Sequence, residues 1–244
     1  KKGGIFMNNL LWTGGWDSTF RLLDLVINKK IEVQPHYIID KDRPSLKHEI
    51  DAMKKIREMV KEKDEGSGSL IRETIFVNVE DIPRNESITS YYKKLLSRSH
   101  IGSQYEWLAR YVDSMGINNL ELCNHKDGTI YNFIRDDVYF VEEENDSYYK
   151  MKEELLRPEL RMFKKFRFPI LDLTKTDMGE IAKKSGFFDI MQETWFCHRP
   201  TRRGTPCGWC NPCKVTRKQG LSNRVPAKLV GFLNNVDRKL KRYF

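Results

Sequence analysis

The stretch that most constrains this chain is a glycine-rich turn between an apolar run and an amphipathic segment. The apolar run ends at Trp12, and Thr13-Gly14-Gly15 follows it directly. From Phe20 onward, apolar residues recur at the 3.6-residue spacing of a helix. Glycine reaches positive φ and lets a backbone approach a ligand, and the N–H groups at a helix N-terminus attract anions. The pattern predicts strand, tight loop and helix, and it fits either an anion site or a plain turn.

The side chains around this turn are the candidates for contact with an anion. Asp17, Ser18 and Thr19 suit the N-cap or first turn of a helix. No lysine follows the second glycine at the required spacing, which excludes a Walker A loop. The residues predicted to contact an anion here are Thr13, Gly14, Gly15, Trp16, Asp17, Ser18 and Thr19.

Strand-like and helix-like patterns alternate along the rest of the chain. This alternation predicts an α/β fold, a Rossmann-like parallel sheet of about five strands with helices on both faces. Residues 64–69 are expected to form a flexible connection, and residues 148–166 a charged helix or lid. The strands are expected at 5–12, 32–39, 70–79, 119–123 and 168–171, and the main helices at 20–27, 45–62, 88–96, 103–115 and 174–184.

Polar residues follow two of the expected strands. Asp40 comes directly after the second strand, and His125 and Asp127 come after the fourth. In an open α/β sheet, a carboxylate at the carboxyl end of a strand can face a nucleotide. We therefore predict that Asp40 and Asp127 line the pocket. His125 fits a core or surface position equally well and is given no role.

Length and charge narrow the class of protein. With 244 residues, the chain suits one α/β domain, residues 1–190, and a small appendage, residues 191–244. The net charge of +9 suits an anionic partner such as ATP, tRNA or an acidic protein, and it equally fits an ordinary basic cytosolic protein. No apolar run approaches the ~20 residues that span a bilayer. No signal peptide is visible, so a cytoplasmic location without membrane contact is expected.

Four of the five cysteines are gathered near the C-terminus, which favours a metal site over disulfides. Cys197 is followed, after nine intervening residues, by Cys207, Cys210 and Cys213, which lie three positions apart from one another. Four thiolates bind Zn²⁺ tetrahedrally and leave no open position for catalysis, so a structural zinc site is predicted. An iron–sulfur cluster or a redox pair are the rival interpretations. Cys123 stands apart and is interpreted as a small buried hydrophobe.

Taken together, these motifs resemble those of the 7-cyano-7-deazaguanine synthases, the QueC family of PP-loop ATP pyrophosphatases. The resemblance covers most of the chain unevenly. It rests on the loop from Thr13 to Ser18, with Thr13 in place of the family's first serine, and on Pro169-Ile170 before Thr174-Lys175-Thr176-Asp177. It also rests on Thr194-Trp195-Phe196-Cys197 and on the spacing of the last three cysteines.

The middle of the chain departs from the family pattern. Asp40-Lys41-Asp42-Arg43 keeps only the leading aspartate of the family's Asp-Tyr-Gly-Gln-x-His segment, and Glu49 matches its later glutamate. Arg98-Ser99 looks like the family's Arg-Asn pair. The family's Tyr-Pro-Asp-Cys-Arg substrate segment is replaced by residues 128–135, and residues 142–165 look like additional material.

The resemblance implies that a carboxylate is activated by ATP. The substrate would be 7-carboxy-7-deazaguanine, whose carboxylate attacks the α-phosphate of ATP and releases pyrophosphate. The loop from Thr13 to Ser18 would hold the pyrophosphate, and Asp17 would bind Mg²⁺ or organise the loop. Lys175 and Arg98 would balance phosphate charge. The implied cofactors are ATP, Mg²⁺ and Zn²⁺, and the predicted catalytic residues are Asp17, Ser18, Lys175 and Arg98.

The amine that displaces AMP is open at this point. In ordinary members of the family it is ammonia, and the amide becomes a nitrile at the expense of a second ATP. In a defence-associated, antiviral QueC-like relative it would be a protein amine, and a homodimer or a complex with a protein substrate would fit that reading. A tRNA-modifying PP-loop enzyme and a non-enzymatic binding module are further alternatives. The basic C-terminal tail is explained by a solvated helix end, so nucleic acid is not expected as a partner.

Overall fold

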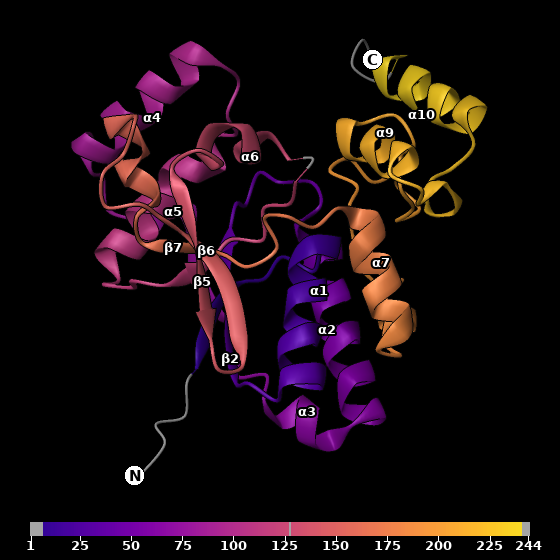
Figure 1. The fold of residues 1–244 in the computed structure, drawn as a ribbon. Coiled ribbons are helices and arrows are strands. Elements are labelled where there is room, and N and C mark those ends of the chain that lie inside the picture. The colour runs from indigo at the N-terminus through magenta and orange to yellow at the C-terminus, as the bar shows by residue number, and fades with distance from the viewer. Residues whose placement is uncertain (1–6, 127, 241–244) are drawn as a thin grey trace.

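The computed structural model describes residues 7–126 and 128–240, with no side-chain description beyond residue 236. Its centre is a seven-stranded sheet of order β3-β2-β1-β4-β7-β6-β5 (Figure 1). The first five strands in this order are parallel, whereas β6 runs antiparallel to both of its neighbours, β7 and β5. The strands are β1 (Asn8–Leu11), β2 (Val33–Ile39), β3 (Ile75–Asn78), β4 (Leu120–Glu121), β5 (Val138–Glu143), β6 (Asp146–Met151) and β7 (Phe166–Phe168).

Helices cover both faces of this sheet, as the alternating pattern predicted. The helices are α1 (Trp16–Leu23), η1 (Asp24–Lys29), α2 (Leu46–Lys63), α3 (Glu65–Ser69), η2 (Val79–Asp81), α4 (Glu86–Arg98), α5 (Gln104–Ser114), α6 (Thr129–Ile134), η3 (Pro158–Phe163), α7 (Lys175–Lys184), α8 (Phe188–Met191), α9 (Asn211–Lys218), η4 (Ser222–Arg224) and α10 (Lys228–Leu240). Among the described residues, no helix is both long and apolar enough to cross a bilayer.

Two hydrophobic cores explain why the helices divide between the faces. Apolar residues of α1, α2, α7 and α8 pack with Leu10 and Trp12 of the first strand segment, both fully buried. Residues of α4, α5, α6 and η3 pack with Phe166 and Phe168 of β7. Burial of apolar surface at about 25 cal/mol per Å² stabilises both layers. The Rossmann-like α/β prediction is therefore confirmed.

The glycine-rich loop follows β1, and the order of the strands in the sheet reverses between β1 and β4. β1 pairs with β2 on one side and with β4 on the other, both in parallel. At such a switch point, the loops that leave the carboxyl ends of neighbouring strands turn to opposite faces and open a crevice for a ligand. The glycine-rich loop follows β1 directly, between Leu11 and Trp16.

The edge hairpin corrects the prediction for the charged segment. Residues 148–166 form no charged helix or lid: they contain the end of β6, a 3-10 segment and the start of β7. One charge of the hairpin is paired inside the protein. The Arg21 guanidinium donates to Asp146 of β6 at 2.9 Å and to Glu121 of β4 at 2.8 Å. Sequence patterns do not reveal such buried ion pairs. The hairpin raises the strand number from about five to seven.

The other local corrections are small. Residues 64–69 are not a flexible connection, because the Asp64 side chain accepts the Gly66 N–H and caps the short helix α3. The third strand is shorter than expected, since only Ile75–Asn78 pairs continuously with β2. Ile71 adds one isolated bridge to Val33.

The C-terminal part has its own small core. The four clustered cysteines and Val225 are buried together, with Trp209 and Phe196 packed against them. Figure 1 shows α9 and α10 together at one end of the molecule. The division into residues 1–190 and 191–244 stays a prediction.

Candidate functional site

The glycine-rich loop has a backbone that only glycine fits. Gly14 has φ of +65°, and a Cβ there would lie 2.9 Å from the carbonyl oxygen of Glu49 on α2. Side chains rarely adopt that φ, and a carbon–oxygen contact of 2.9 Å is a clash. Gly15 is extended and forms the N-cap position of α1. The loop therefore passes close against α2, and the N-terminus of α1 opens toward a cavity.

Two hydroxyl groups close the base of the loop. The Thr13 backbone N–H donates to Ser18 Oγ over 3.3 Å, and the two hydroxyl oxygens lie 3.5 Å apart. Thr19 points elsewhere: its hydroxyl accepts the Trp12 indole N–H at 3.0 Å and its side chain is fully buried. The Thr19 side chain therefore faces the core, and its contact with a ligand stays a prediction. A helical residue next to a loop points into the core whenever its position faces the sheet.

Asp17 and Lys175 face each other although 157 residues lie between them in the sequence. Lys175 Nζ lies 3.7 Å from Asp17 Oδ1, and His125 Nε2 lies 4.0 Å from Asp17 Oδ2. Asp17 Oδ1 is a buried oxygen with no hydrogen-bond partner among the described residues. A capping box between Thr174 and Asp177 begins α7 and places Lys175 at its first turn. This local device explains how the lysine reaches the loop.

A cavity of about 300 Å³ lies in front of the loop. Cations and aromatic rings from distant segments share its wall with Asp17. Its volume is at the lower end for small-molecule sites. Beyond the loop and Lys175, its lining includes Trp16, Arg43, Glu49, Trp195, His198 and Arg224.

Glu49 organises one wall of this cavity. It is 4% exposed and accepts from Tyr37 Oη at 2.8 Å and from Ser45 Oγ at 2.7 Å. It also pairs with Arg43 Nε at 3.0 Å. The other end of that guanidinium lies 3.4 Å from His198 Nε2, and burial, followed by the charge of Arg43, lowers the pKa of His198. A buried carboxylate thus fixes the direction of one arginine, and that arginine together with burial disfavours the charged form of the imidazole.

Arg224 joins the C-terminal segment to the loop helix. Its guanidinium donates to the Thr194 hydroxyl at 2.9 Å and to the Gln192 carbonyl at 3.0 Å. It also lies over the rings of Trp16 and Phe196, at 5.4 and 5.3 Å. Cation–π contacts of this kind gain strength where water is excluded. Burial lowers the pKa of Arg224 to about 10, which still leaves it charged at neutral pH.

The four cysteines form a metal-binding arrangement. All four thiols are buried, and their sulfur atoms lie within 4.8 Å of one another. Individual separations are 3.8 Å between Cys197 and Cys210, 3.9 Å between Cys207 and Cys213 and 3.5 Å between Cys210 and Cys213. Zn–S bonds of about 2.3 Å at tetrahedral angles place sulfur atoms about 3.8 Å apart. The cluster is therefore compatible with a metal ion such as zinc.

Backbone N–H groups already point at the sulfur atoms. The Cys207 N–H donates to Cys197 Sγ at 3.2 Å, and the Cys210 N–H donates to Cys207 Sγ at 3.3 Å. Such hydrogen bonds stabilise thiolates and orient them toward a shared ion. Gly208, at φ of +80°, supplies the turn between this pair. The donor set is all sulfur, which suits a closed structural site.

One residue connects the loop to the cluster. The Trp195 backbone N–H donates to the Gly14 carbonyl at 2.8 Å, and its indole N–H donates to the Cys197 carbonyl at 2.7 Å. The indole also stacks on His48 of α2, with ring centroids 4.4 Å apart. The Thr194–Cys197 segment therefore forms part of the cavity wall and the first part of the metal site at once.

Two predicted residues, Arg98 and Asp40, lie away from this group. Arg98 ends α4 and pairs with Glu159 at 2.9 Å, and it does not line the cavity. Asp40 is exposed, and its carboxylate accepts the Asp42 N–H in a turn. Asp127 lies outside the described residues. The remaining loop residues, Lys175 and the cysteines occupy the positions described above, and the roles assigned to them stay predictions.

Sequence reasoning gave no role to Arg43, His198 and Arg224, which line the cavity. Arg43 stands where the family pattern is broken, and Arg224 is one of many basic residues near the C-terminus. His198 directly follows a cysteine of the cluster. Only that adjacency was a usable signal, because cavity residues drawn from different segments carry no common spacing.

The fold and loop define a Rossmann-like α/β protein with a glycine-rich loop at the switch point of its sheet. Residues 129–225 match the family model described as queuosine biosynthesis protein QueC. That segment begins with α6 and ends at Val225. It includes Lys175 and all four clustered cysteines, whereas the glycine-rich loop precedes it. The chain is therefore similar to this family over its C-terminal part.

The other comparisons are distant. The chain is similar to a solved 4-thiouridine synthetase in complex with RNA and with bound ATP, at 15% identity and a TM-score of 0.37. The match covers 93% of this chain and 53% of the other, so the chain spans about half the length of that protein. No curated protein matches the chain.

Proposed function

We propose that this protein is an ATP-dependent ligase that adenylates a carboxylate and releases pyrophosphate. The observation that carries the proposal is the meeting of three segments at one cavity. The loop after β1 presents Asp17, α7 presents Lys175 at 3.7 Å, and the Thr194–Cys197 segment closes the wall. The last two segments lie within the part that is similar to QueC.

The loop has the groups that a pyrophosphate needs. Free N–H groups at the start of α1 and the hydroxyls of Thr13 and Ser18 would hold its oxygens. Lys175 and Arg43 would balance its charge from two sides of the cavity. These groups are fixed before the substrate arrives, so little reorganisation is required as charge develops on the leaving pyrophosphate.

The unpaired carboxylate oxygen of Asp17 fits a divalent cation. Mg²⁺ prefers oxygen ligands and is commonly bound by one or two carboxylates together with substrate phosphates. Asp17 Oδ1 is buried and lacks a hydrogen-bond partner within the described ranges 7–126 and 128–240, and the neighbouring lysine is 3.7 Å away. Asp17 would hold this ion, which would supply charge neutralisation at the phosphates. Arg98 pairs with Glu159 and does not line this cavity, so we assign it no contact with the phosphates.

The similarity to QueC supports a deazapurine carboxylate, 7-carboxy-7-deazaguanine, as the acid. Its carboxylate would attack the α-phosphate of ATP to give an acyl-adenylate and pyrophosphate. An amine would then attack the acyl carbon and expel AMP. With ammonia the product is an amide, and a second ATP-dependent dehydration gives the nitrile.

A protein amine is the alternative nucleophile, as in a defence-associated relative. Two departures from the family pattern favour it. Residues 129–134 form α6 where the family has its Tyr-Pro-Asp-Cys-Arg segment, and Arg43 lines the cavity beside a stretch that keeps only one family residue. A changed acceptor side fits a changed nucleophile.

Pyrophosphate release tests adenylation directly. The purified, metal-loaded chain is incubated with ATP, Mg²⁺ and 7-carboxy-7-deazaguanine, and pyrophosphate and AMP are quantified. We expect carboxylate-dependent release that falls at least 100-fold in Asp17→Asn and in Lys175→Met. Lys184→Met, an exposed lysine on the same helix, is the matched control and should keep the wild-type rate. Unchanged release by folded Asp17→Asn would refute the assignment of the loop.

Mass spectrometry of the same reaction separates the two nucleophiles. With ammonium present and no other protein, a nitrile or amide product supports the first. Acyl-adenylate that turns over only when a partner protein is added supports the second.

A further inference from the structure

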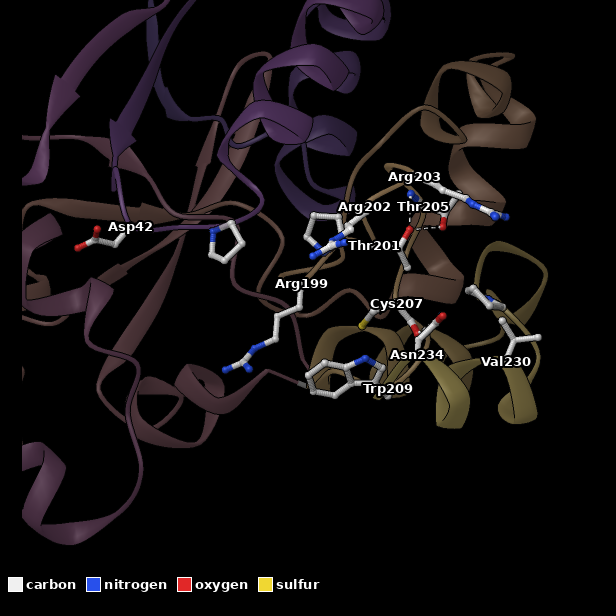
Figure 2. A pocket seen from close by; sticks show the side chains of 13 residues that line it. Asp42, Arg199, Thr201, Arg202, Arg203, Thr205, Cys207, Trp209, Val230 and Asn234 are labelled. Atoms are coloured by element: carbon white, nitrogen blue, oxygen red, sulfur yellow. Dashed lines mark hydrogen bonds between the residues drawn. The ribbon is translucent and has the colours of Figure 1, made fainter. Parts of the chain in front are cut away.

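A second, larger cavity lies beside the cysteine cluster. Its volume is about 1110 Å³, and it opens between the loop of residues 199–205 and α10, with Cys207 and Trp209 in its floor. Figure 2 shows its lining, with Arg202 and Arg203 on the loop and Val230 and Asn234 on the helix. The proposed adenylation chemistry uses none of these side chains.

This cavity is separate from the one at the glycine-rich loop. The two cavities share a wall that is made by two short segments. In each segment, two consecutive residues line different cavities. Asp42 and Arg199 line the large cavity, whereas Arg43 and His198 line the small one. The contact of 3.4 Å between Arg43 and His198 closes the wall on the small-cavity side.

The large cavity is strongly basic. Arg199, Arg202 and Arg203 line it, and Asp42 is the one acidic residue among the described residues of its lining. Within the part of the chain that the structure describes, none of the three arginines forms an ion pair. Arg199 lies over the Trp209 ring at 5.5 Å, which holds its guanidinium at the cavity. Three guanidinium groups without carboxylate partners attract an anionic ligand.

The loop that carries the arginines is held in shape by its own hydrogen bonds. The Thr201 N–H donates to the Thr205 carbonyl at 2.9 Å, and their hydroxyls lie 2.7 Å apart. Gly204, at φ of +75°, donates its N–H to the Thr201 carbonyl at 3.0 Å. Cys207 then ties the end of the loop to the cluster. The arginines are therefore presented by a fixed turn.

The apolar surface of α10 continues from the rim of this cavity. Gly231 packs against Gly208, where a Cβ would meet a carbonyl oxygen at 2.8 Å, and Asn234 Nδ2 donates to the Cys207 carbonyl at 3.1 Å. That inner face anchors the helix. Leu229, Phe232 and Leu233 remain outside, with 69%, 62% and 56% of their surface exposed. Helix geometry places Leu233 about 60° around the axis from Val230, which lines the cavity.

The combination of charge and apolar surface identifies the class of ligand. The volume exceeds the roughly 300–1,000 Å³ typical of small-molecule sites. A nucleic acid would satisfy the arginines but has no aliphatic side chains to cover the leucines of α10. A peptide with acidic and large apolar side chains satisfies both, and burial of the leucines would add hydrophobic stabilisation. We propose that the groove formed by the loop of residues 199–205 and α10 binds an acidic amphipathic segment of a partner protein.

The proposal does not depend on adenylation, and an unbiased selection tests it. A library of random 16-residue peptides displayed on their messenger RNAs is selected on the full, metal-loaded chain. It is counter-selected on Arg199→Glu/Arg203→Glu. We expect enriched peptides that combine Asp or Glu with Leu or Phe. A random RNA library is selected in parallel on the same two proteins.

Fluorescence anisotropy with the tightest labelled peptide then locates the site. We expect its Kd to rise at least 10-fold in Arg199→Glu/Arg203→Glu and at least 3-fold in Leu233→Ser. Arg84→Glu/Arg161→Glu changes two exposed arginines that do not line this cavity; it is the matched control for net charge and should change the Kd less than 2-fold. Metal content and circular dichroism establish that each variant is folded, and Leu233→Ser tests the groove without a charge reversal.

Three outcomes overturn the proposal. Peptide selection can give no enrichment that depends on the two arginines. The enriched peptides can lack acidic residues. The RNA library can instead yield the groove-dependent binders, which would assign the groove to nucleic acid.

Discussion

The glycine-rich loop and the cysteine cluster reach their geometry in opposite ways. The cluster is closed by contacts among nearby residues: two N–H groups donate to sulfur atoms within the same short segment. The loop depends on distant contacts, with Glu49 on α2 behind Gly14 and Trp195 hydrogen-bonded to its carbonyl. A local pattern is thus enough to define the cysteine cluster, whereas the loop takes its shape only inside the complete fold.

The two regions are nevertheless joined through Trp195. It donates one hydrogen bond to each region, at 2.8 Å to Gly14 and at 2.7 Å to Cys197. Because both regions hold the same residue, the free energy that orders one contributes to ordering the other. This shared residue makes the comparison testable, since each region can be damaged alone and the effect measured at the other.

Damage to the cluster should have the largest effect. Cys210→Ala removes one of four sulfur ligands, and because metal binding free energy is folding free energy at such a site, we expect loss of the metal and of at least about 4 kcal/mol of stability. Metal analysis and urea unfolding measure both. Cys123→Ala is the matched control, since Cys123 lies outside the cluster. One bound zinc per chain in Cys210→Ala would show that the four sulfur atoms are not the ligands.

Damage to the loop should come next. Gly14→Ala adds a Cβ at φ of +65° and 2.9 Å from a carbonyl oxygen, so backbone strain and the clash together should cost about 3 kcal/mol. Gly116→Ala is the control, because Gly116 has the same φ of +65° and a Cβ there would have no described atom within 4 Å. It should cost about 1 kcal/mol. Equal losses in urea unfolding of the two variants would mean that α2 gives way and that the loop is not tightly held.

Acid should weaken the strands under the loop through His36. Burial lowers the pKa of His36 to about 4, and its Nε2 lies 2.9 Å from Asn9 Oδ1 on β1. The unfolded chain takes up a proton near the ordinary histidine pKa of 6.5, before the folded protein does, so stability is lost as the pH falls from 6.5 toward 4. Between pH 7.5 and 5 we expect a loss of about 2 kcal/mol.

Variants separate this effect from acid release of the metal. His36→Gln should flatten the pH dependence of urea unfolding by about that amount and leave the pH of metal release unchanged. The control, His100→Gln, changes an exposed histidine and should keep the wild-type slope. A wild-type slope in His36→Gln would assign the acid sensitivity to the cluster alone.

Weakening the connection itself should have the smallest effect. Trp195→Phe keeps the backbone hydrogen bond to Gly14 and removes the indole N–H that donates to the Cys197 carbonyl. A lost hydrogen bond of this kind costs about 1 kcal/mol, so chelator competition should show metal affinity reduced about five-fold. Trp107→Phe, a partly buried tryptophan on α5, should leave metal affinity unchanged. If Trp195→Phe also leaves it unchanged, the two regions are independent.

The sequence predicted the parts of the fold that repeat a local pattern. Alternating strand and helix signals were sufficient for the sheet and its two helical layers. The hairpin β5–β6 was missed because its charged residues resemble a solvated helix, while Asp146 in fact pairs with Arg21 inside the protein. Long-range ion pairs leave no periodic signal, so a segment that depends on one is assigned by its polarity alone.

The residues of the candidate site fall into two similar groups: those found through a local motif and those brought together only by the fold. The four cysteines were found because a metal requires ligands at short spacing, and their sulfur separations agree with one. Asp17 and Lys175 were placed through motifs, and the structure brings them to 3.7 Å. Arg43, Glu49 and Arg224 meet there only through tertiary structure. Thr19 shows the converse, since a residue inside the motif turned toward the core.

The hydrogen bond from Trp195 to Gly14 has a consequence for biosynthesis. It joins residues that lie 181 positions apart in the sequence, so the contact has a high sequence separation and forms late. During synthesis the strand that carries the loop leaves the ribosome long before the residue that completes the loop. A product that ends before Trp195 therefore carries an unfinished loop, and the cavity in front of that loop lacks part of its wall.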